Sequence, residues 1–417
     1  MPEHKPAHSR SQGRISDRHS TRLHELIIVA TRLFNRNGVL ATRMEEIAES
    51  LGTTPGNLYH YVKSKEELAY RCYLRSCEVR RSQLQIADEP GTTGLQKIEA
   101  FFRQLLVEGQ SRTAVLGEIG VLKPEWANRI RRLQRDNTAA AQNIIASGIE
   151  DGSIRPSNPF LTGIGILGIV EWISYWYTNR LPYTRDEVTV AMLDIVTSGV
   201  TAHRPYDVNL PKMAQPFPAL EVPDPFDKDA MAKLKLQHFL RAAMHAFNRD
   251  GVKATSIDKL ARQLNVTKGA FYHYFDSKEE LLYRCYERAI EFNNSALLQE
   301  TEDYNQREVL TRRSLFERHV SELGPFPVYT NVKALEGVRQ KQVMRELEAT
   351  QSSDQARIRA AIEAGELRQV DPFIAEKVRA GLINWFPIWY SPNGRATPTE
   401  VADNHSDLFL NGIRKQA

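Results

Sequence analysis

The chain has 417 residues, of which 41% are hydrophobic and 25% are charged, and its formal net charge is +4. This length predicts more than one domain, and the ordinary composition excludes a disordered or fibrous protein. Three cysteines exclude a disulfide framework, and their spacing matches no zinc site.

The N-terminal stretch is basic, and it is not followed by the apolar segment of a signal peptide. The most apolar stretch, FLTGIGILGIVEWISYWY, contains Glu171, so we expect a buried helix rather than a membrane span. We therefore expect a cytoplasmic protein that associates with the nucleoid and has no membrane partner. Residues 1–20 are expected to form a basic, disordered arm.

Residues 21–68 predict four successive helices, of which the last continues beyond this range. The apolar face of the first has helical spacing: Leu23, Leu26, Ile27, Ala30 and Phe34. Gly38 is expected to end that helix. The following helices are expected to start at residue pairs typical of N-termini: Thr42 with Glu45, Thr54 with Pro55, and Ser64 with Glu67.

Residues 69–203 continue with helical periodicity and form a larger domain. Residues 204–227 contain six prolines, which disfavour helix and favour extended backbone, so this segment is expected to be a linker.

After the linker the sequence repeats itself. The stretch GNLYHYVKSKEEL from Gly56 returns as GAFYHYFDSKEEL from Gly269, a shift of 213 (269 minus 56), and the same register holds to the end of both copies. Residues 228–281 therefore correspond to 21–68, and residues 282–417 correspond to 69–203. A period this long indicates a tandem duplication of a whole protein rather than a solenoid.

Three short helices with a tight turn between the second and third are typical of a helix-turn-helix. A glycine in the first turn of the third helix allows close approach of a partner surface. Tyrosine, histidine and lysine side chains nearby are suited to phosphate oxygens. The repeated stretch thus favours binding to a nucleic-acid backbone.

Each copy resembles a complete member of the Tet-repressor (TetR) family of transcription regulators, on residues Phe34 to Leu68 and Phe247 to Leu281. The resemblance implies an all-α protein in which each unit has a helix-turn-helix domain and a helical domain for effector binding and pairing. It implies operator DNA and a small-molecule effector as partners. The histidines lack the spacing of metal ligands and show no pairing with a serine or cysteine nucleophile, so we expect no metal, cofactor or enzymatic activity.

The resemblance also assigns residues. The DNA-binding residues would be Thr42, Thr54, Pro55, Gly56, Asn57, Tyr59, His60 and Lys65, and Thr255, Thr267, Lys268, Gly269, Ala270, Tyr272, His273 and Lys278. Pro55 departs from the polar or basic residue that is common in the family at this position.

An apolar cavity for a lipophilic or acyl-type effector could be lined by Phe101, Phe102, Leu105, Leu116, Trp126 and Trp172, although each is also a plausible core residue. The two units are expected to pair within the chain as a covalent pseudo-dimer, through Phe160–Tyr177 and Ile374–Tyr390. Two alternatives stay open at this stage: further dimerisation of the chain, and a helical small-molecule-binding or scaffold protein whose heads are vestigial.

Overall fold

The computed structural model describes residues 8–105, 113–178, 180–203, 205–211, 224, 226–296, 301–321 and 323–415. Over these residues the chain consists of helices and connecting segments, with isolated β-bridges and no strand. The expected all-α class is therefore confirmed. We call residues 21–68 head one, 69–203 body one, 228–281 head two and 282–417 body two.

Unit one comprises head one and body one. Its elements are α1 (His8–Asn37), α2 (Met44–Ser50), α3 (Pro55–Leu58), α4 (Lys65–Ala87), α5 (Gly94–Arg103), η1 (Ile119–Val121), α6 (Pro124–Glu150), α7 (Pro159–Trp176) and α8 (Arg185–Ser198). Because α1 begins at His8, the prediction of a disordered arm is wrong over residues 8–20. Residues 1–7 of that arm lie outside the described residues.

Unit two repeats the order of unit one. Its elements are α9 (Lys228–Asp250), α10 (Ile257–Gln263), α11 (Lys268–Tyr274), α12 (Lys278–Ala296), α13 (Tyr304–Val320), η2 (Tyr329–Ala334), α14 (Gly337–Glu363), α15 (Pro372–Asn384), α16 (Phe386–Trp389) and α17 (Pro398–Asn411). The helix equivalent to α7 is divided into α15 and α16. Pro387 in α16 stands where unit one has Ser174, and proline removes a backbone donor and clashes with the preceding turn.

The helix ends explain why both heads fold alike. Gly38 and Gly251 follow α1 and α9 with φ of 81° and 82°, a conformation that favours glycine. Ser64 and Ser277 each accept a hydrogen bond of 3.1 Å from the backbone N–H three residues on, as expected.

The predicted caps of α2 and α10 are wrong. Thr42 and Thr255 are buried, and their hydroxyls donate to the carbonyl oxygen four residues earlier, at 2.8 and 2.9 Å. The N-cap residues are instead Arg43 and Ser256. The two threonines therefore brace the turn that enters the second helix of each head.

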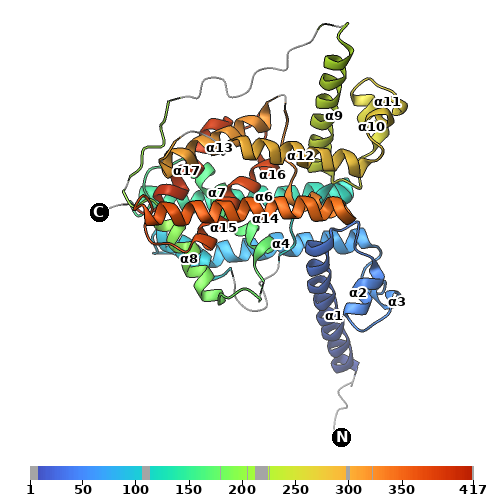
Figure 1. Cartoon of the computed structure of the whole chain (residues 1–417). Coiled ribbons are helices and arrows are strands. Elements are labelled where there is room, and N and C mark those ends of the chain that lie inside the picture. The colour runs from blue at the N-terminus through green and yellow to red at the C-terminus, as the bar shows by residue number, and fades with distance from the viewer. Residues whose placement is uncertain are drawn as a thin grey trace.

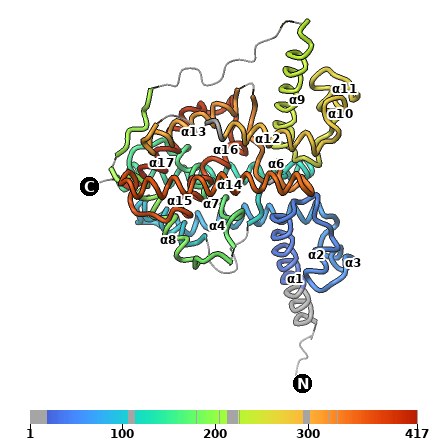
Figure 2. Tube along the Cα trace, viewed as in Figure 1, coloured from blue at the N-terminus to red at the C-terminus, as the bar shows by residue number. Residues whose placement is uncertain are grey.

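Figure 1 shows both heads at one end of the molecule and the C-terminus at the other. The long helices α1 and α9 point away from the bodies in opposite directions, as the trace in Figure 2 also shows. The first part of the predicted linker, residues 205–211, contacts body two, where Arg313 donates to the carbonyl oxygens of Val208 and Leu210. Most of the remaining linker lies outside the described residues.

The two bodies share one apolar core. One cluster of buried side chains includes Ile166 and Val170 of α7 and Val378 and Leu382 of α15, and these two helices lie against each other. Among the described helices, α7 is long and apolar enough to cross a membrane, but most of it is buried in this core. The segments predicted to pack together thus carry the contact between the units.

Polar contacts between the bodies come in pairs related by the same shift of 213. Arg155 forms a salt bridge of 2.6 Å with Asp407, and its equivalent Arg368 forms one of 2.6 Å with Asp194. Two residues that each contact the other's equivalent are the signature of a twofold axis. The two units are therefore related by a pseudo-twofold axis.

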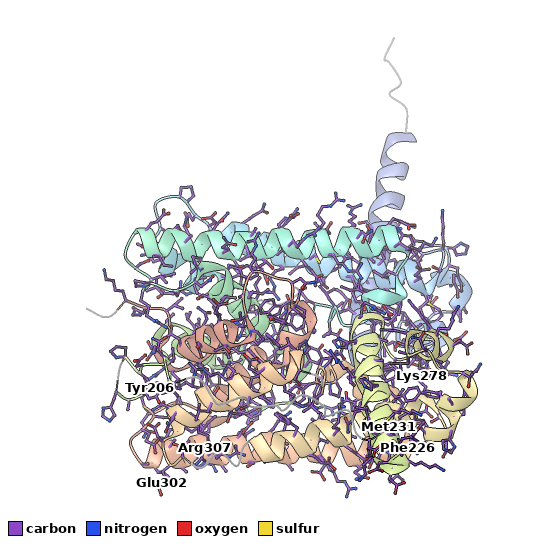
Figure 3. All side chains as sticks on the ribbon, turned by 90° about the horizontal axis from the view of Figure 1, so that it is seen from above. Tyr206, Phe226, Met231, Lys278, Glu302 and Arg307 are labelled. Atoms are coloured by element: carbon purple, nitrogen blue, oxygen red, sulfur yellow. The ribbon has the colours of Figure 1, made fainter. Side chains whose placement is uncertain are left out.

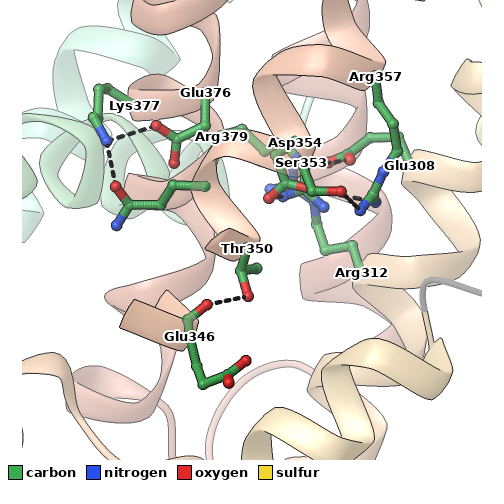
Figure 4. Close-up of polar contacts among 11 residues, drawn as sticks. Glu308, Arg312, Glu346, Thr350, Ser353, Asp354, Arg357, Glu376, Lys377 and Arg379 are labelled. Atoms are coloured by element: carbon green, nitrogen blue, oxygen red, sulfur yellow. Dashed lines mark hydrogen bonds and ion pairs between the residues drawn. The ribbon is translucent and has the colours of Figure 1, made fainter. Parts of the chain in front are cut away.

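Body two replaces part of the apolar core by ions (Figure 4). Arg379 lies between Glu308 at 2.6 Å and Asp354 at 2.9 Å, and Arg312 also pairs with Glu308. The equivalents in body one of Arg379, Glu308, Asp354 and Arg312 are Ile166, Leu95, Ala141 and Glu99. The two units have therefore diverged strongly in the buried part of their bodies.

His405 provides a pH-dependent contribution to stability. Burial lowers its pKa to about 3, whereas the unfolded chain takes up this proton below a pKa of about 6.5. Stability from this residue is therefore lost as the pH falls through that interval, by about 2 kcal/mol between pH 7 and pH 5. We expect His405→Met, which copies the equivalent Met192, to reduce the difference in urea-unfolding free energy between these pH values by that amount. An unchanged difference would contradict the assignment.

Candidate nucleic-acid interface and ligand cavity

The turn between the second and third helices has the same backbone in both heads. Gly52 has φ of 62°, and its equivalent Asn265 has φ of 55°, which makes it a non-glycine residue in the left-handed region. Asparagine is one of the few other residues that adopt this conformation readily. The exchange of glycine for asparagine at equivalent positions is therefore a sequence signal for this turn.

The third helix of each head presents the predicted residues to solvent. Tyr59 and Tyr272 have half of their surface exposed, and the adjacent His60 and His273 are also exposed. Thr54, Gly56, Asn57, Thr267, Lys268 and Gly269 are exposed as well, and Pro55 and Ala270 are partly buried. We call these residues, at α3 and at α11, the two reading surfaces.

The two glycines of the reading surfaces have no packing role within the chain. A Cβ added at Gly56 would meet only the hydroxyl of Thr54, at 3.9 Å, and one at Gly269 would meet only that of Thr267, at 3.8 Å. Both distances are ordinary van der Waals contacts. Packing within the chain does not require glycine at either position, and the missing side chain leaves the backbone open to close approach from outside.

Two predicted residues in each head lie elsewhere. Thr42 and Thr255 are buried with bonded hydroxyls, so their side chains cannot contact DNA. Lys65 donates to the carbonyl oxygens of Leu40 and Thr42, both at 2.9 Å, and Lys278 makes the equivalent pair of contacts at 3.0 Å. Desolvation by burial lowers the pKa of both lysines. Each lysine thus holds the loop before the second helix in place.

The two reading surfaces differ in their polar groups. In head one, Asn57 donates to the hydroxyl of Thr53 at 2.9 Å. In head two, Lys268 forms an exposed ion pair of 3.2 Å with Asp258. Exposed ion pairs contribute little stability, so the ammonium group of Lys268 can exchange this carboxylate for another acceptor at small cost.

Comparison with known protein families identifies both halves of each unit. The pattern of bacterial regulatory proteins of the tetR family matches residues 26–72 and 239–285, and that of the tetracyclin repressor-like C-terminal domain matches 93–200 and 311–413. The chain belongs to the TetR family. Both patterns occur once in each unit, so the tandem duplication is confirmed, and the reading surfaces lie in the N-terminal domains of this family.

Relatives of this TetR-family chain match less than half of its length, which is about the length of one unit. The HTH-type transcriptional repressor KstR2 of Mycolicibacterium smegmatis is 26% identical over 192 residues, which are 44% of this chain and 92% of the relative. The HTH-type transcriptional activator FasR of the same species is 24% identical over 182 residues, which are 42% of this chain and 82% of the relative. Both relatives are named as regulators of transcription.

Among solved structures, that of AibR in complex with isovaleryl coenzyme A and operator DNA is similar to 42% of this chain and to 97% of its own chain. Its sequence identity is 23% and its TM-score is 0.36. The TetR-family regulator PfmR from Thermus thermophilus covers 42% of this chain and 99% of its own, with 26% identity and a TM-score of 0.36.

Most of the residues expected to line an effector cavity are packed instead. Phe101 and Phe102 are fully buried in the shared core together with Leu105, and Trp126 stacks on Tyr70 at 4.9 Å. Trp172 packs edge-on against a tyrosine of unit two. Of the six residues, Leu116 lines a large cavity, and the other five pack against neighbouring side chains outside it.

That large cavity has a volume of about 770 Å³ and lies against body one. We call it the unit-one cavity. Its walls combine residues of α4, α6 and α7 with residues of unit two: Ser76, Cys77, Arg80, Leu116, Gln134, Leu167 and Glu171 from unit one, and Asn248, Arg249, Trp385, Ile388, Trp389 and Arg395 from unit two. Sequence reasoning missed Arg80 and Glu171, whose only signal was a charge on an otherwise apolar helix face.

The polar side chains of the unit-one cavity are held in place by a salt bridge and a hydrogen bond. Arg80 and Glu171 form a salt bridge of 3.0 Å, and their side chains are 6% and 15% exposed. Arg80 also donates to Gln83 at 2.8 Å. Burial raises the pKa of the Cys77 thiol to about 12, so it stays neutral. Among the described residues, no group of three His, Cys, Asp or Glu side chains could hold a metal ion.

Proposed function

We propose that the chain is a ligand-responsive transcriptional repressor that binds operator DNA through two non-identical heads of one covalent pseudo-dimer. The observation that carries this proposal is the pair of reading surfaces, each with a glycine that nothing in the chain requires. Both heads lie at the same end of the molecule (Figure 1), which is the arrangement needed to contact one DNA duplex.

The charge of head two and its place at one end of the molecule also support DNA binding. Figure 3 shows Lys278 at the end of the molecule that holds head two, whereas Tyr206, Glu302 and Arg307 lie at the opposite end. The exposed basic residues of head two include Lys253, Lys259, Arg262 and Lys268. A basic surface of this kind is attracted to phosphate groups before any base is read.

Effector binding is proposed for the unit-one cavity. Its volume falls within the range of about 300 to 1,000 Å³ that is usual for small-molecule sites. The cavity touches Asn248 and Arg249 at the C-terminal end of α9, the first helix of head two. A bound effector would therefore contact the helix whose position sets the orientation of that head.

The operator is expected to contain two dissimilar half-sites, because the reading surfaces differ. Asn57 offers an amide that can pair with adenine, while Lys268 can reach guanine acceptors and Ala270 offers only a methyl group. We expect Asn57→Ala and Lys268→Ala to weaken binding by about 1 to 3 kcal/mol each, in different halves of the operator. Selection of DNA sequences bound by the full chain measures this.

A matched variant sharpens the test. Pro55→Lys combined with Asn57→Ala copies the residues of head two onto head one, so the selected sequence should approach an inverted repeat. Recovery of a perfect inverted repeat by the unmodified chain would refute the proposal of non-identical heads. Absence of any selected sequence would favour a helical small-molecule-binding or scaffold protein with vestigial heads.

A further inference from the structure

Each unit has a cavity at the same place, but the two cavities differ greatly in size. Six residues of body one that line the unit-one cavity are Ser76, Cys77, Arg80, Leu116, Gln134 and Glu171. Adding 213 gives Ala289, Ile290, Asn293, Tyr329, Leu347 and Asn384, and all six line a second cavity of about 90 Å³. We call this the unit-two cavity. It is too small for the ligands that occupy typical small-molecule sites.

Aromatic side chains fill the space in body two. Tyr329 replaces Leu116, Phe386 replaces Ile173, and Phe316 replaces Arg103. The rings of Phe316 and Phe386 stack with centroids 3.9 Å apart and an interplanar angle of 4°. Such packed rings have no room to move without opening the core. The difference in volume thus follows from the sequence of the two copies.

The buried ion pair of the unit-one cavity is also absent from its counterpart. Arg80 and Glu171, which form the salt bridge of 3.0 Å, are replaced by Asn293 and Asn384. A buried ion pair gives a cavity a polar point that can orient a ligand, whereas two amides carry no charge. The unit-two cavity therefore lacks a charged lining residue as well as the space.

The lining of the unit-one cavity is basic, even though Arg80 is paired with Glu171. Its lining includes five arginines against two acidic residues: Arg80, Arg131, Arg135, Arg249 and Arg395 against Asp136 and Glu171. The equivalents of Arg131 and Arg135 in unit two are Met344 and Glu348. Apolar residues, among them Leu167, Ile388 and Trp389, form much of the remaining wall. This combination suits a ligand with an apolar body and an anionic group.

We propose that the chain binds one effector, in the unit-one cavity, that this effector is an amphipathic anion, and that the unit-two cavity is permanently closed. This inference rests on the proposed function for the existence of an effector. It adds the stoichiometry, the chemical class and the route of regulation. The route crosses between units, since a ligand held by body one also contacts α9 and α16 of unit two.

Calorimetric titration of the full chain with decanoate tests the stoichiometry and the class together, with decan-1-ol as the uncharged ligand of equal chain length. The expected result is one decanoate per chain, bound at least tenfold more tightly than the alcohol. Two decanoates per chain would overturn the single-site proposal. Equal affinity for the alcohol, or no binding of decanoate, would overturn the assigned class.

Exchange of equivalent residues locates the site. Leu116→Tyr copies the residue that helps to close the unit-two cavity, and it should weaken decanoate binding at least tenfold. The matched control Tyr329→Leu should leave the affinity unchanged at the occupied site. The reverse pattern would place the ligand in body two and refute the proposal.

A surface variant covers the case in which Leu116→Tyr fails to fold. Arg135 is exposed, so Arg135→Glu, which copies Glu348, should fold normally. It should weaken decanoate binding several-fold and leave binding of the alcohol unchanged. Equal loss for both ligands, or no loss for either, would contradict an anionic group at this end of the cavity.

Measurement of operator binding distinguishes failure of the single-site assignment from failure of the proposed function. If decanoate binds once per chain but never releases selected DNA, the ligand-responsive function fails while the single-site assignment stands. If DNA is bound and released but two ligands bind per chain, only the single-site assignment fails.

Discussion

Gly199→Ala is expected to destabilise the protein by about 3 kcal/mol or more and to loosen the contact between the two bodies. Gly199 follows α8 with φ of 65°, a region that residues with side chains rarely adopt. A Cβ at this position would lie 2.2 Å from the carbonyl oxygen of Leu410. The substitution therefore adds a clash with the backbone of the other unit to the local strain.

A control separates these two effects. Gly91 has φ of 81°, but a Cβ added there would meet nothing within 4 Å. Gly91→Ala should therefore cost only the local strain, about 1 kcal/mol. Chemical denaturation of both variants measures the difference. Equal losses would show that close approach of the two units at Gly199 does not contribute to stability.

The affinity for operator DNA should fall in the same order as the stability of these variants. The positions of the two heads are determined by how the bodies pack, and the backbone of Val200, next to Gly199, donates to the carbonyl oxygen of Leu410 at 2.9 Å. Displacement of this segment should weaken binding to the selected operator more in Gly199→Ala than in Gly91→Ala. A Cβ added at the equivalent Gly412 would lie 2.4 Å from the backbone nitrogen of Gly199, so Gly412→Ala should behave similarly.

Local sequence patterns predicted the elements of the heads well, because glycine stops and serine caps act within a few residues. The same patterns failed at Thr42, where Thr and Glu at capping spacing suggested a helix start. The Thr42 hydroxyl instead donates back to Gly38, which a pattern of residue types does not distinguish from a cap.

Contacts between the bodies were only partly predictable. The sequence predicted pairing through Phe160–Tyr177 and Ile374–Tyr390, and the repeat indicated equivalent roles for the two segments. Residues that line the unit-one cavity come from helices far apart in the sequence, and an aromatic residue in the core looks like one at a cavity wall. Phe101 and Trp126 lie outside the unit-one cavity for this reason, while Trp385 and Ile388, contributed by the other unit, gave no local signal.

The second large effect is expected in body two, where Arg379→Ile should destabilise the protein by about 3 to 5 kcal/mol. Burial alone would lower the pKa of Arg379, but the carboxylates of Asp354 and Glu308 outweigh it and raise that pKa. Removing the cation leaves two buried carboxylates with one fewer partner. Isoleucine is the residue that unit one has at this position, so its size and shape suit this fold.

A compensating change tests whether the loss comes from charge or from packing. Asp354→Ala copies Ala141 of unit one, and together with Arg379→Ile it removes one positive and one negative charge while Glu308 keeps its contact with Arg312. If unpaired charge causes the loss, the double variant should recover at least half of the stability lost by Arg379→Ile, measured by urea denaturation. Additive losses would instead indicate that the ions contribute mainly by filling space.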